Sequence, residues 1–162
     1  MKNKDLEKMA DLVKDIRIAM LTTIDEEGDL RSRPMATNEI KEEGVLYFFT
    51  EESSPKVHEL DTNGKVNISY IDRDDQIYVS VSGRASHSKD KNKINELWTP
   101  YLKAWFPKGK DDPNICLLKV DISKAEYWDA PGNKMVRLAG MTKAVLTGEQ
   151  YKPGENKKIN LK

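Results

Sequence analysis

The sequence predicts an α+β protein: a six-stranded antiparallel β-barrel with flanking helices. Three observations support this. Apolar segments with β-branched or alternating residues recur along the chain, short turns separate them, and a few stretches with helical spacing interrupt them. With 162 residues, the chain is long enough for one domain with a proper core. We expect this domain at residues 1–150, followed by a C-terminal extension at residues 151–162.

The first half of the chain predicts one helix followed by three strands. Apolar residues recur at helical spacing near the N-terminus, and the period then changes to that of a strand. Pro34 indicates an edge strand or a barrel rim, because proline cannot donate a hydrogen bond to a neighbouring strand. The expected helix is residues 3–16, the expected strands are residues 18–24, 30–40 and 45–50, and the turns between these strands are residues 25–28 and 41–44.

The second half predicts a short helix, a hairpin, a longer helix and a last long strand. The short helix ends at Asn63-Gly64, which is typical of a helix C-terminus, and Gly83 allows a β-bulge or a close backbone approach. The tail from Tyr151 is rich in Lys, Asn and Gly, so we expect it to be loosely held. The expected helices are residues 54–60 and 89–106, and the expected strands are residues 65–72, 76–87 and 114–122, the last continuing towards residue 128.

Composition narrows the class of protein. Lys and Arg together number 27, as do Asp and Glu, so the chain lacks the basic excess of a general nucleic-acid binder. It contains no apolar run of 18 residues and does not open like a signal peptide, so we expect a soluble cytoplasmic protein without a membrane partner. The single cysteine, Cys116, cannot form an internal disulfide and is expected in the core.

Several kinds of catalytic site are not indicated. His58 and His87 are the only histidines, and neither belongs to a metal-binding pattern, so no metal site is expected. The chain has no G-x-S-x-G elbow, P-loop or G-x-G-x-x-G motif. No side chain stands out as a nucleophile or general acid–base, and the catalytic residues are left unassigned. An enzyme of this sequence would take its reactivity from a cofactor.

Two short stretches predict a phosphate-binding site. In the first, residues 31–35, strand alternation places Arg31 and Arg33 on one face, where they repel each other unless solvent or an anion separates them. In the second, residues 49–56, Ser53 or Ser54 is suited to the N-cap and Pro55 to the first helical position. Lys56 then lies in the first helical turn, where the dipole disfavours a cation unless a phosphate binds. The alternative is that these charges are solvated or paired with nearby acidic residues.

The order and spacing of these motifs resemble the pyridoxamine 5'-phosphate oxidase-like FMN-binding split barrel, and in particular its general stress protein 26 branch. Asn63-Gly64-Lys65-Val66, the segment at residues 105–109 and the segment at residues 125–129 contribute to the resemblance, which covers Leu6 to about Gly148. It implies a homodimer of six-stranded split barrels with FMN in two clefts at the subunit interface.

The resemblance also implies which residues bind the cofactor. The strand at residues 31–35 would line the phosphate and ring, and Thr50, Ser54 and Lys56 would hold the phosphate and ribityl chain. Gln76 would face the isoalloxazine, and Trp128, with Arg137 as a further candidate, would reach it from the partner subunit. The full set of implied cofactor-binding residues is Arg31, Ser32, Arg33, Pro34, Met35, Phe49, Thr50, Ser53, Ser54, Lys56, Gln76 and Trp128.

Two departures argue against vitamin B6 oxidation. The true oxidases of this family carry an Arg-x-His pair just after the C-terminal tryptophan, and the segment after Trp128 has no such pair. Where those enzymes have an arginine before the lysine of the phosphate site, this chain has Pro55.

The resulting hypothesis is an FMN-binding protein, a flavin-dependent oxidoreductase that acts on an unidentified small molecule, with NAD(P)H as the reductant and a stress response as the context by analogy. The first alternative is a non-catalytic flavin-binding module that serves as a reservoir or sensor. Others are a haem or deazaflavin ligand and a purely structural dimer. The phosphate site leaves FAD open as well as FMN.

Overall fold

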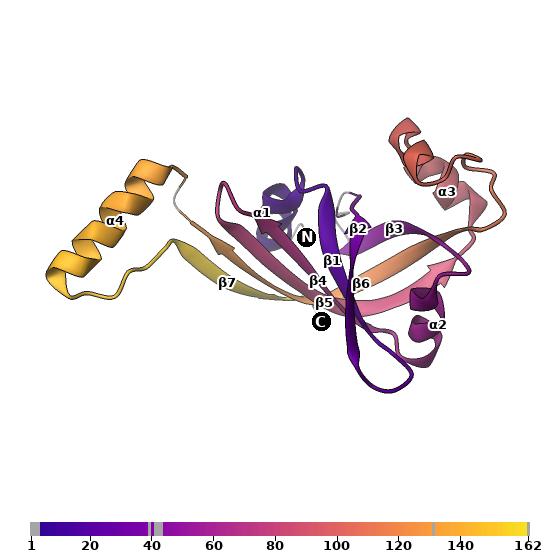
Figure 1. Ribbon diagram of the computed structural model, residues 1–162, viewed down its shortest axis with the longest axis horizontal. Helices are drawn as coiled ribbons and strands as arrows, with labels where there is room; N and C mark the ends of the chain where they lie inside the picture. Colours follow the sequence, from indigo (N-terminus) through magenta and orange to yellow (C-terminus); the bar gives the residue numbers. More distant parts are fainter. Residues whose placement is uncertain (1–3, 39, 41–43, 131, 162) are drawn as a thin grey trace.

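The computed structural model describes residues 4–38, 40, 44–130 and 132–161. In this part of the chain, helices flank one seven-stranded antiparallel sheet (Figure 1). In chain order, the elements are α1 Lys4–Val13, β1 Ile18–Ile24, β2 Leu30–Ala36, β3 Val45–Glu51, α2 Pro55–Thr62, β4 Lys65–Asp72, β5 Ile77–Ser88, α3 Lys91–Leu97, the 3-10 helix η1 Pro100–Ala104, β6 Ile115–Asp129, α4 Lys134–Thr147 and β7 Glu155–Asn160.

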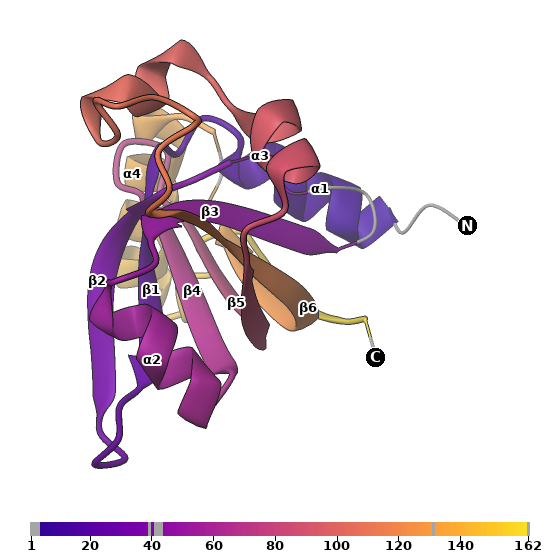
Figure 2. The ribbon, with the colours of Figure 1, turned by 90° about the vertical axis from the view of Figure 1, so that its right-hand side faces the viewer.

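The sheet curls into an open barrel. Its strand order is β2-β1-β4-β5-β6-β3, and β7 pairs with β6 off this path. The end strands β2 and β3 approach each other without hydrogen bonding in the described part of the chain, so the barrel stays unclosed (Figure 2). The predicted α+β class and split barrel are confirmed, with one strand more than expected. Pro34 lies on edge strand β2, where its missing N–H leaves no partner unsatisfied.

Two apolar clusters form the core. The larger lies inside the barrel beneath α1 and α2, and its fully buried members include Met9, Leu21, Phe48 and Ile68. The smaller connects α3 and η1 to β3 and β6, and it consists of Phe49, Ile94, Leu102, Phe106, Ile115 and Leu117. The second cluster anchors η1 over the open edge between β2 and β3.

The helix expected over residues 89–106 is divided. α3 ends at Leu97, and η1 begins at Pro100. Trp98 and Thr99 are both extended, as is typical of residues that precede a proline, and the proline ring cannot continue a regular helix.

The C-terminal region is more ordered than its composition suggested. α4 was not expected, although Asn133 caps it by accepting from the Val136 N–H over 2.8 Å and Gly148 ends it in the left-handed conformation. The tail expected to be loosely held instead forms β7, which pairs along β6 and buries Ile159. The division into residues 1–150 and 151–162 stays a prediction.

Several smaller expectations can be compared with the structure. Gly83 lies at a register shift between β5 and β6, which confirms the predicted bulge. Residue 39 of the expected second strand, residues 41–43 of the following turn and residue 3 of the first helix lie outside the described residues. Among the described helices, none is long and apolar enough to cross a membrane.

Candidate functional site

A cavity of about 250 Å³ lies between the open edge of the barrel and η1. Edge strands β2 and β3, the start of α2 and the 3-10 helix each contribute one part of its wall. Its lining residues are Pro34, Met35, Ala36, Phe49, Thr50, Glu51, Ser54, Lys56, Leu102, Trp105 and Phe106. Six of the residues expected at a cofactor site therefore meet in one cavity.

Lys56 is the polar centre of this cavity. Its ammonium Nζ donates to Thr50 Oγ1 over 2.9 Å and to Ser54 Oγ over 2.6 Å. Ser54 occupies the N-cap position of α2, but its side chain makes no capping hydrogen bond and accepts from Lys56 instead. Because a hydroxyl that accepts from an ammonium still has its own proton to donate, Thr50 and Ser54 can each serve a further acceptor.

The electrostatics of the cavity favour an anion. The pKa of Lys56 is held below its usual value, first by burial and then by the positive charge of Arg33, which outweigh the opposing effects of Glu51 and Glu59. A half-buried cation beside a second cation is destabilised, and an anion bound between them would relieve the repulsion.

Arg33 and Arg31 converge on a buried carboxylate that the sequence patterns missed. Arg33 Nη2 lies 2.8 Å from Glu59 Oε2, and Arg31 Nη1 lies 2.9 Å from Glu59 Oε1. Thr23 donates to Glu59 Oε2 over 2.5 Å and accepts from Arg33 Nη1. The acidic residues near the arginines in sequence are not these partners. Glu59 lies on α2, 26 residues beyond Arg33, so no local spacing indicated the contact.

Glu59 is ionised in this setting. Burial by itself would raise its pKa, but the hydrogen bond from Thr23 and the charges of Arg33 and Arg31 bring the pKa below its usual value. Three cations, Lys56, Arg33 and Arg31, lie near two carboxylates, Glu59 and Glu51, so the local net charge is about +1 and favours an anionic ligand.

An apolar wall faces the cationic side of the cavity. Phe49 packs edge-on against Trp98 at 5.9 Å between ring centroids, and Phe106 lies 6.3 Å from Phe49. Trp105 packs edge-on against Tyr101, with 5.0 Å between ring centroids, and stays 47% exposed. Trp98 and Phe106 thus serve the core, while Trp105 presents an open aromatic face at the mouth of the cavity.

The other predicted residues do not line this cavity, Arg33 included, although the charge of Arg33 acts on Lys56. The Ser32 hydroxyl lies 2.7 Å from Thr22 Oγ1 on the opposite face of β2, which gives it no place at the cavity. Arg31 and Ser53 line a neighbouring cavity of about 390 Å³ with Asp25, Glu26, Glu27, Pro55, His58 and Glu59. This cavity is acidic, so the two stretches expected to form one phosphate site contribute to two different cavities.

Gln76 and Trp128 are also absent from the lining of the Lys56 cavity. Gln76 lies in the β4–β5 turn with a φ of 55°, and Trp128 is paired with Tyr78 on the exposed face of the sheet. Arg137, expected as a further residue reaching a partner's cofactor, is buried. It donates to the Asp74 carbonyl over 2.9 Å, so it holds the turn of its own chain.

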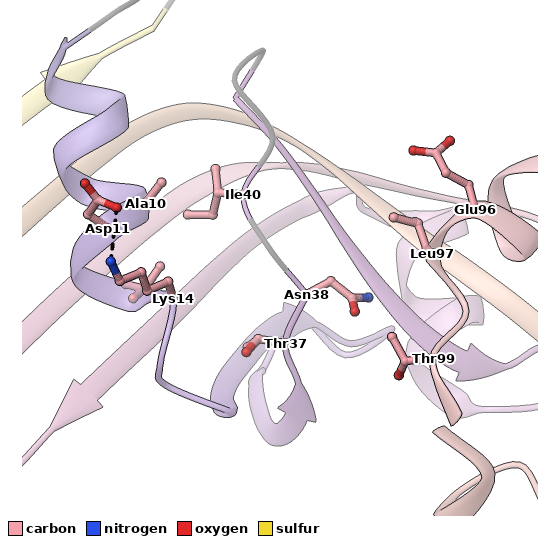
Figure 3. A pocket seen from close by; sticks show the side chains of 10 residues that line it. Ala10, Asp11, Lys14, Thr37, Asn38, Ile40, Glu96, Leu97 and Thr99 are labelled. Carbon is pink, nitrogen blue, oxygen red and sulfur yellow. Dashed lines mark ion pairs between the residues drawn. The ribbon is translucent and has the colours of Figure 1, made fainter. Parts of the chain in front are cut away.

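Another cavity, of about 460 Å³, lies between α1 and α3 and has a different character (Figure 3). The Asp11–Lys14 ion pair lies on one side, Glu96 and Leu97 lie on the other, and Thr37 and Asn38 lie between them. Its charged groups have mixed signs and do not converge on one point. The smaller cavity at Lys56 is therefore the candidate ligand site. Within the described residues, no group of His, Cys, Asp and Glu side chains is placed to hold a metal ion.

The fold and this site define a class: an α+β protein whose open antiparallel barrel carries a cationic, hydroxyl-lined cavity with an aromatic wall. Residues 4–152 match the family described as Pyridoxamine 5'-phosphate oxidase like, and the chain belongs to this family.

Individual relatives agree with this assignment. Protein bli-3 of Neurospora crassa is 31% identical over 143 residues, which cover 82% of this chain and 68% of that protein. A crystal structure described as a general stress protein 26, from Jannaschia sp. CCS1, is 26% identical with a TM-score of 0.76, covering 98% of this chain and 99% of that one. The general stress FMN/FAD binding protein of Xanthomonas citri is 30% identical with a TM-score of 0.69, covering 81% and 93%. The predicted family and its general stress protein 26 branch are confirmed.

Proposed function

We propose that this chain binds FMN through the Lys56 cavity and serves as a flavin-dependent oxidoreductase for a small molecule. One observation carries the proposal: the Lys56 ammonium is held by the Thr50 and Ser54 hydroxyls close to Arg33, next to an apolar wall. This arrangement suits a ligand that combines a dianionic head with a flat apolar body. A related protein of Xanthomonas citri is named as an FMN/FAD binding protein, which supports a flavin as that ligand.

Each part of the cavity would have its own task. Lys56, Thr50 and Ser54 would hold the phosphate, with Arg33 next to them. Met35, Phe49 and Trp105 would exclude water from the apolar part of the ligand. A bound flavin supplies hydride and electron transfer at its ring, with NAD(P)H as the proposed reductant. The protein would contribute binding, orientation and electrostatics.

We further propose that the functional unit is a homodimer with the flavin at the subunit interface. Ile71, Tyr78 and Trp128 lie side by side across β4, β5 and β6, and each is at least 40% exposed. Ile18 and Met20 add to this apolar face from β1. Monomeric proteins rarely leave such a contiguous apolar surface uncovered. Gln76 and Trp128 would then reach the cofactor of the partner subunit, since neither lines the cavity of its own chain.

α4 supports the same proposal. It projects from the end of the molecule opposite to α3 (Figure 1), and only Arg137 of its residues is buried. An isolated 14-residue helix is marginal in water, so a surface that covers its apolar side chains would stabilise it. Its exposed apolar residues are Met135, Val136, Leu138, Met141, Val145 and Leu146.

Two measurements test the function. An absorption spectrum of the purified protein after incubation with FMN and gel filtration is expected to show retained flavin bands. NADPH oxidation with quinone or dye acceptors is then expected to exceed the rate of free FMN. A protein that retains flavin but gives no rate above free FMN would be the non-catalytic module. A protein that retains no flavin would contradict the proposal. The cytoplasmic location stays a prediction.

A further inference from the structure

Glu59 and Thr23 belong to none of the motifs that predicted the site, yet they hold Arg31 and Arg33, which do, and Glu59 lies one helical turn after Lys56 on α2. We propose that Glu59 is a positioning residue, which holds the Arg33 guanidinium beside Lys56 so that both cations meet the phosphate of the ligand. The inference rests on the proposed function and adds a residue to it.

The geometry fixes Arg33 at two points. Nη2 donates to Glu59 over 2.8 Å, and Nη1 donates to Thr23, which itself donates to the same carboxylate oxygen of Glu59. The Arg33 side chain is 19% exposed, whereas that of Arg31 is 53% exposed. These contacts engage two of the five N–H donors of a guanidinium, and the others can serve a ligand.

Arg33 would not hold this position by itself. Arg33 pairs with Glu59, one helical turn after Lys56, and its charge lowers the pKa of Lys56, so the two cations repel each other. Without an anion behind it, a long flexible arginine on an edge strand would turn to solvent. Glu59 supplies that anion, and its 4% exposure leaves it little freedom to move. Ligand binding then starts from an ordered pair of cations and loses less side-chain entropy.

The negative charge of Glu59 does not cancel this benefit. Its carboxylate faces Thr23 and the guanidiniums of Arg31 and Arg33, so two cations neutralise it locally. Arg33 would donate charge-assisted hydrogen bonds directly to the phosphate. Glu59 would repel the phosphate only weakly, because the two arginines offset its charge. We therefore expect Glu59 to favour phosphate binding by orienting Arg33 more than it opposes binding by repelling the phosphate.

Affinities for FMN and for riboflavin, which lacks the phosphate, separate positioning from a general structural role. We expect Glu59→Gln to weaken FMN binding at least tenfold and to change riboflavin binding less than twofold, as measured by isothermal titration calorimetry. Thr23→Val keeps the carboxylate but removes the hydroxyl between it and Arg33, and should weaken FMN selectively to a smaller extent. Asp61→Asn is the matched control, because Asp61 lies on the same helix and pairs with His87 on the surface instead.

The outcomes separate the two proposals. Wild-type protein that does not bind FMN would overturn the proposed function, and this inference with it. Wild-type protein that binds FMN, with an unchanged ratio of FMN to riboflavin affinity in Glu59→Gln and Thr23→Val, would overturn the positioning role alone. Tighter FMN binding by Glu59→Gln would also overturn it, because Glu59 would then act on the phosphate chiefly as a repelling charge. If Glu59→Gln does not fold, Thr23→Val decides.

Discussion

Lys56 Nζ lies 2.6 Å from the hydroxyl of Ser54, a residue that occupies the N-cap position of α2 without making a capping hydrogen bond. An N-cap serine ordinarily accepts from a backbone N–H of the first helical turn, which stabilises a helix by about 1 kcal/mol. Here the hydroxyl accepts from a half-buried lysine that lines the candidate ligand cavity. Ser54 therefore orients the Lys56 ammonium instead of capping the helix. Giving up a stabilising contact in this way is typical of a binding site.

The depressed pKa of Lys56 predicts an alkaline loss of affinity. FMN binding needs the ammonium form. Burial and Arg33 lower the pKa of Lys56 in the free protein, and the phosphate dianion would raise it again in the complex. Affinity should therefore fall as pH rises through the free-protein pKa and level off above the pKa of the complex. Above about pH 8 the phosphate is fully dianionic and contributes no slope of its own.

Fluorescence titration of FMN across this pH range measures the effect, and Lys56→Arg is the control. A guanidinium stays charged throughout, so this variant should lose the Lys56 part of the slope. Riboflavin, which lacks the phosphate, reports ionisation of the flavin ring. An equal slope in the wild type and Lys56→Arg would show that Lys56 does not carry the pH dependence.

The apolar side of α4 predicts a change of oligomeric state. Leu138 is 62% exposed in the single chain. If α4 is covered by a second copy, Leu138→Glu places a charge in an apolar contact and should shift the protein from dimer to monomer. Multi-angle light scattering after gel filtration measures this. Lys110→Glu, on an exposed loop, should leave the mass unchanged. A wild-type protein that is already monomeric at micromolar concentration would contradict the dimer.

Tyr70 predicts a stabilising substitution. Its side chain is 1% exposed, and its hydroxyl has no hydrogen-bond partner among the described residues. Burial also raises the pKa of this phenol, so it stays neutral. Removing an unpaired buried hydroxyl should increase the free energy of unfolding by about 1 kcal/mol in Tyr70→Phe.

Tyr127→Phe is the matched comparison, because the Tyr127 hydroxyl donates to Glu155 over 2.9 Å. This variant should lose about 1 kcal/mol in urea denaturation. If both variants are destabilised alike, the Tyr70 hydroxyl has a partner in solution.

The bulge at Gly83 predicts a strongly destabilising substitution. A Cβ at this position would overlap the Asp121 carbonyl oxygen of the neighbouring strand. Gly83→Ala should therefore lower the free energy of unfolding by roughly 2 to 4 kcal/mol, because backbone must move to make room. Gly132→Ala is the control, since a Cβ there meets no described atom within 4 Å. Equal stability of the two variants in urea denaturation would show that the bulge is absent in solution.

The comparison of prediction and structure shows which kinds of contact a sequence reveals. Ser54, Pro55 and Lys56 are neighbours in the chain, and helix-start preferences were enough to place them. The Arg33–Glu59 pair joins an edge strand to a helix 26 residues later, and the packing of α2 against β1, the strand that pairs with β2, brings these residues together. No periodicity or spacing encodes a contact of this kind.

The missed helix has a different explanation. The expected helices were found from an apolar stripe that faces the core, whereas α4 turns most of its apolar residues outward. Its caps at Asn133 and Gly148 were the available signal. Conversely, aromatic residues at helical spacing predicted a continuous helix over residues 89–106. Pro100 interrupts this helix, because proline cannot continue the hydrogen bonding of a regular helix.

Equilibrium dialysis against FMN tests the central claim most directly, with wild type, Lys56→Ala and Lys65→Ala compared side by side. Lys65 is an exposed lysine at the start of β4 and serves as the matched control. We expect saturable binding of FMN by the wild type and Lys65→Ala, and roughly ten- to hundredfold weaker binding by Lys56→Ala, in line with the loss of one charge-assisted contact. Equal FMN binding by Lys56→Ala and the wild type, or no binding by the wild type, would contradict the assignment of this cavity.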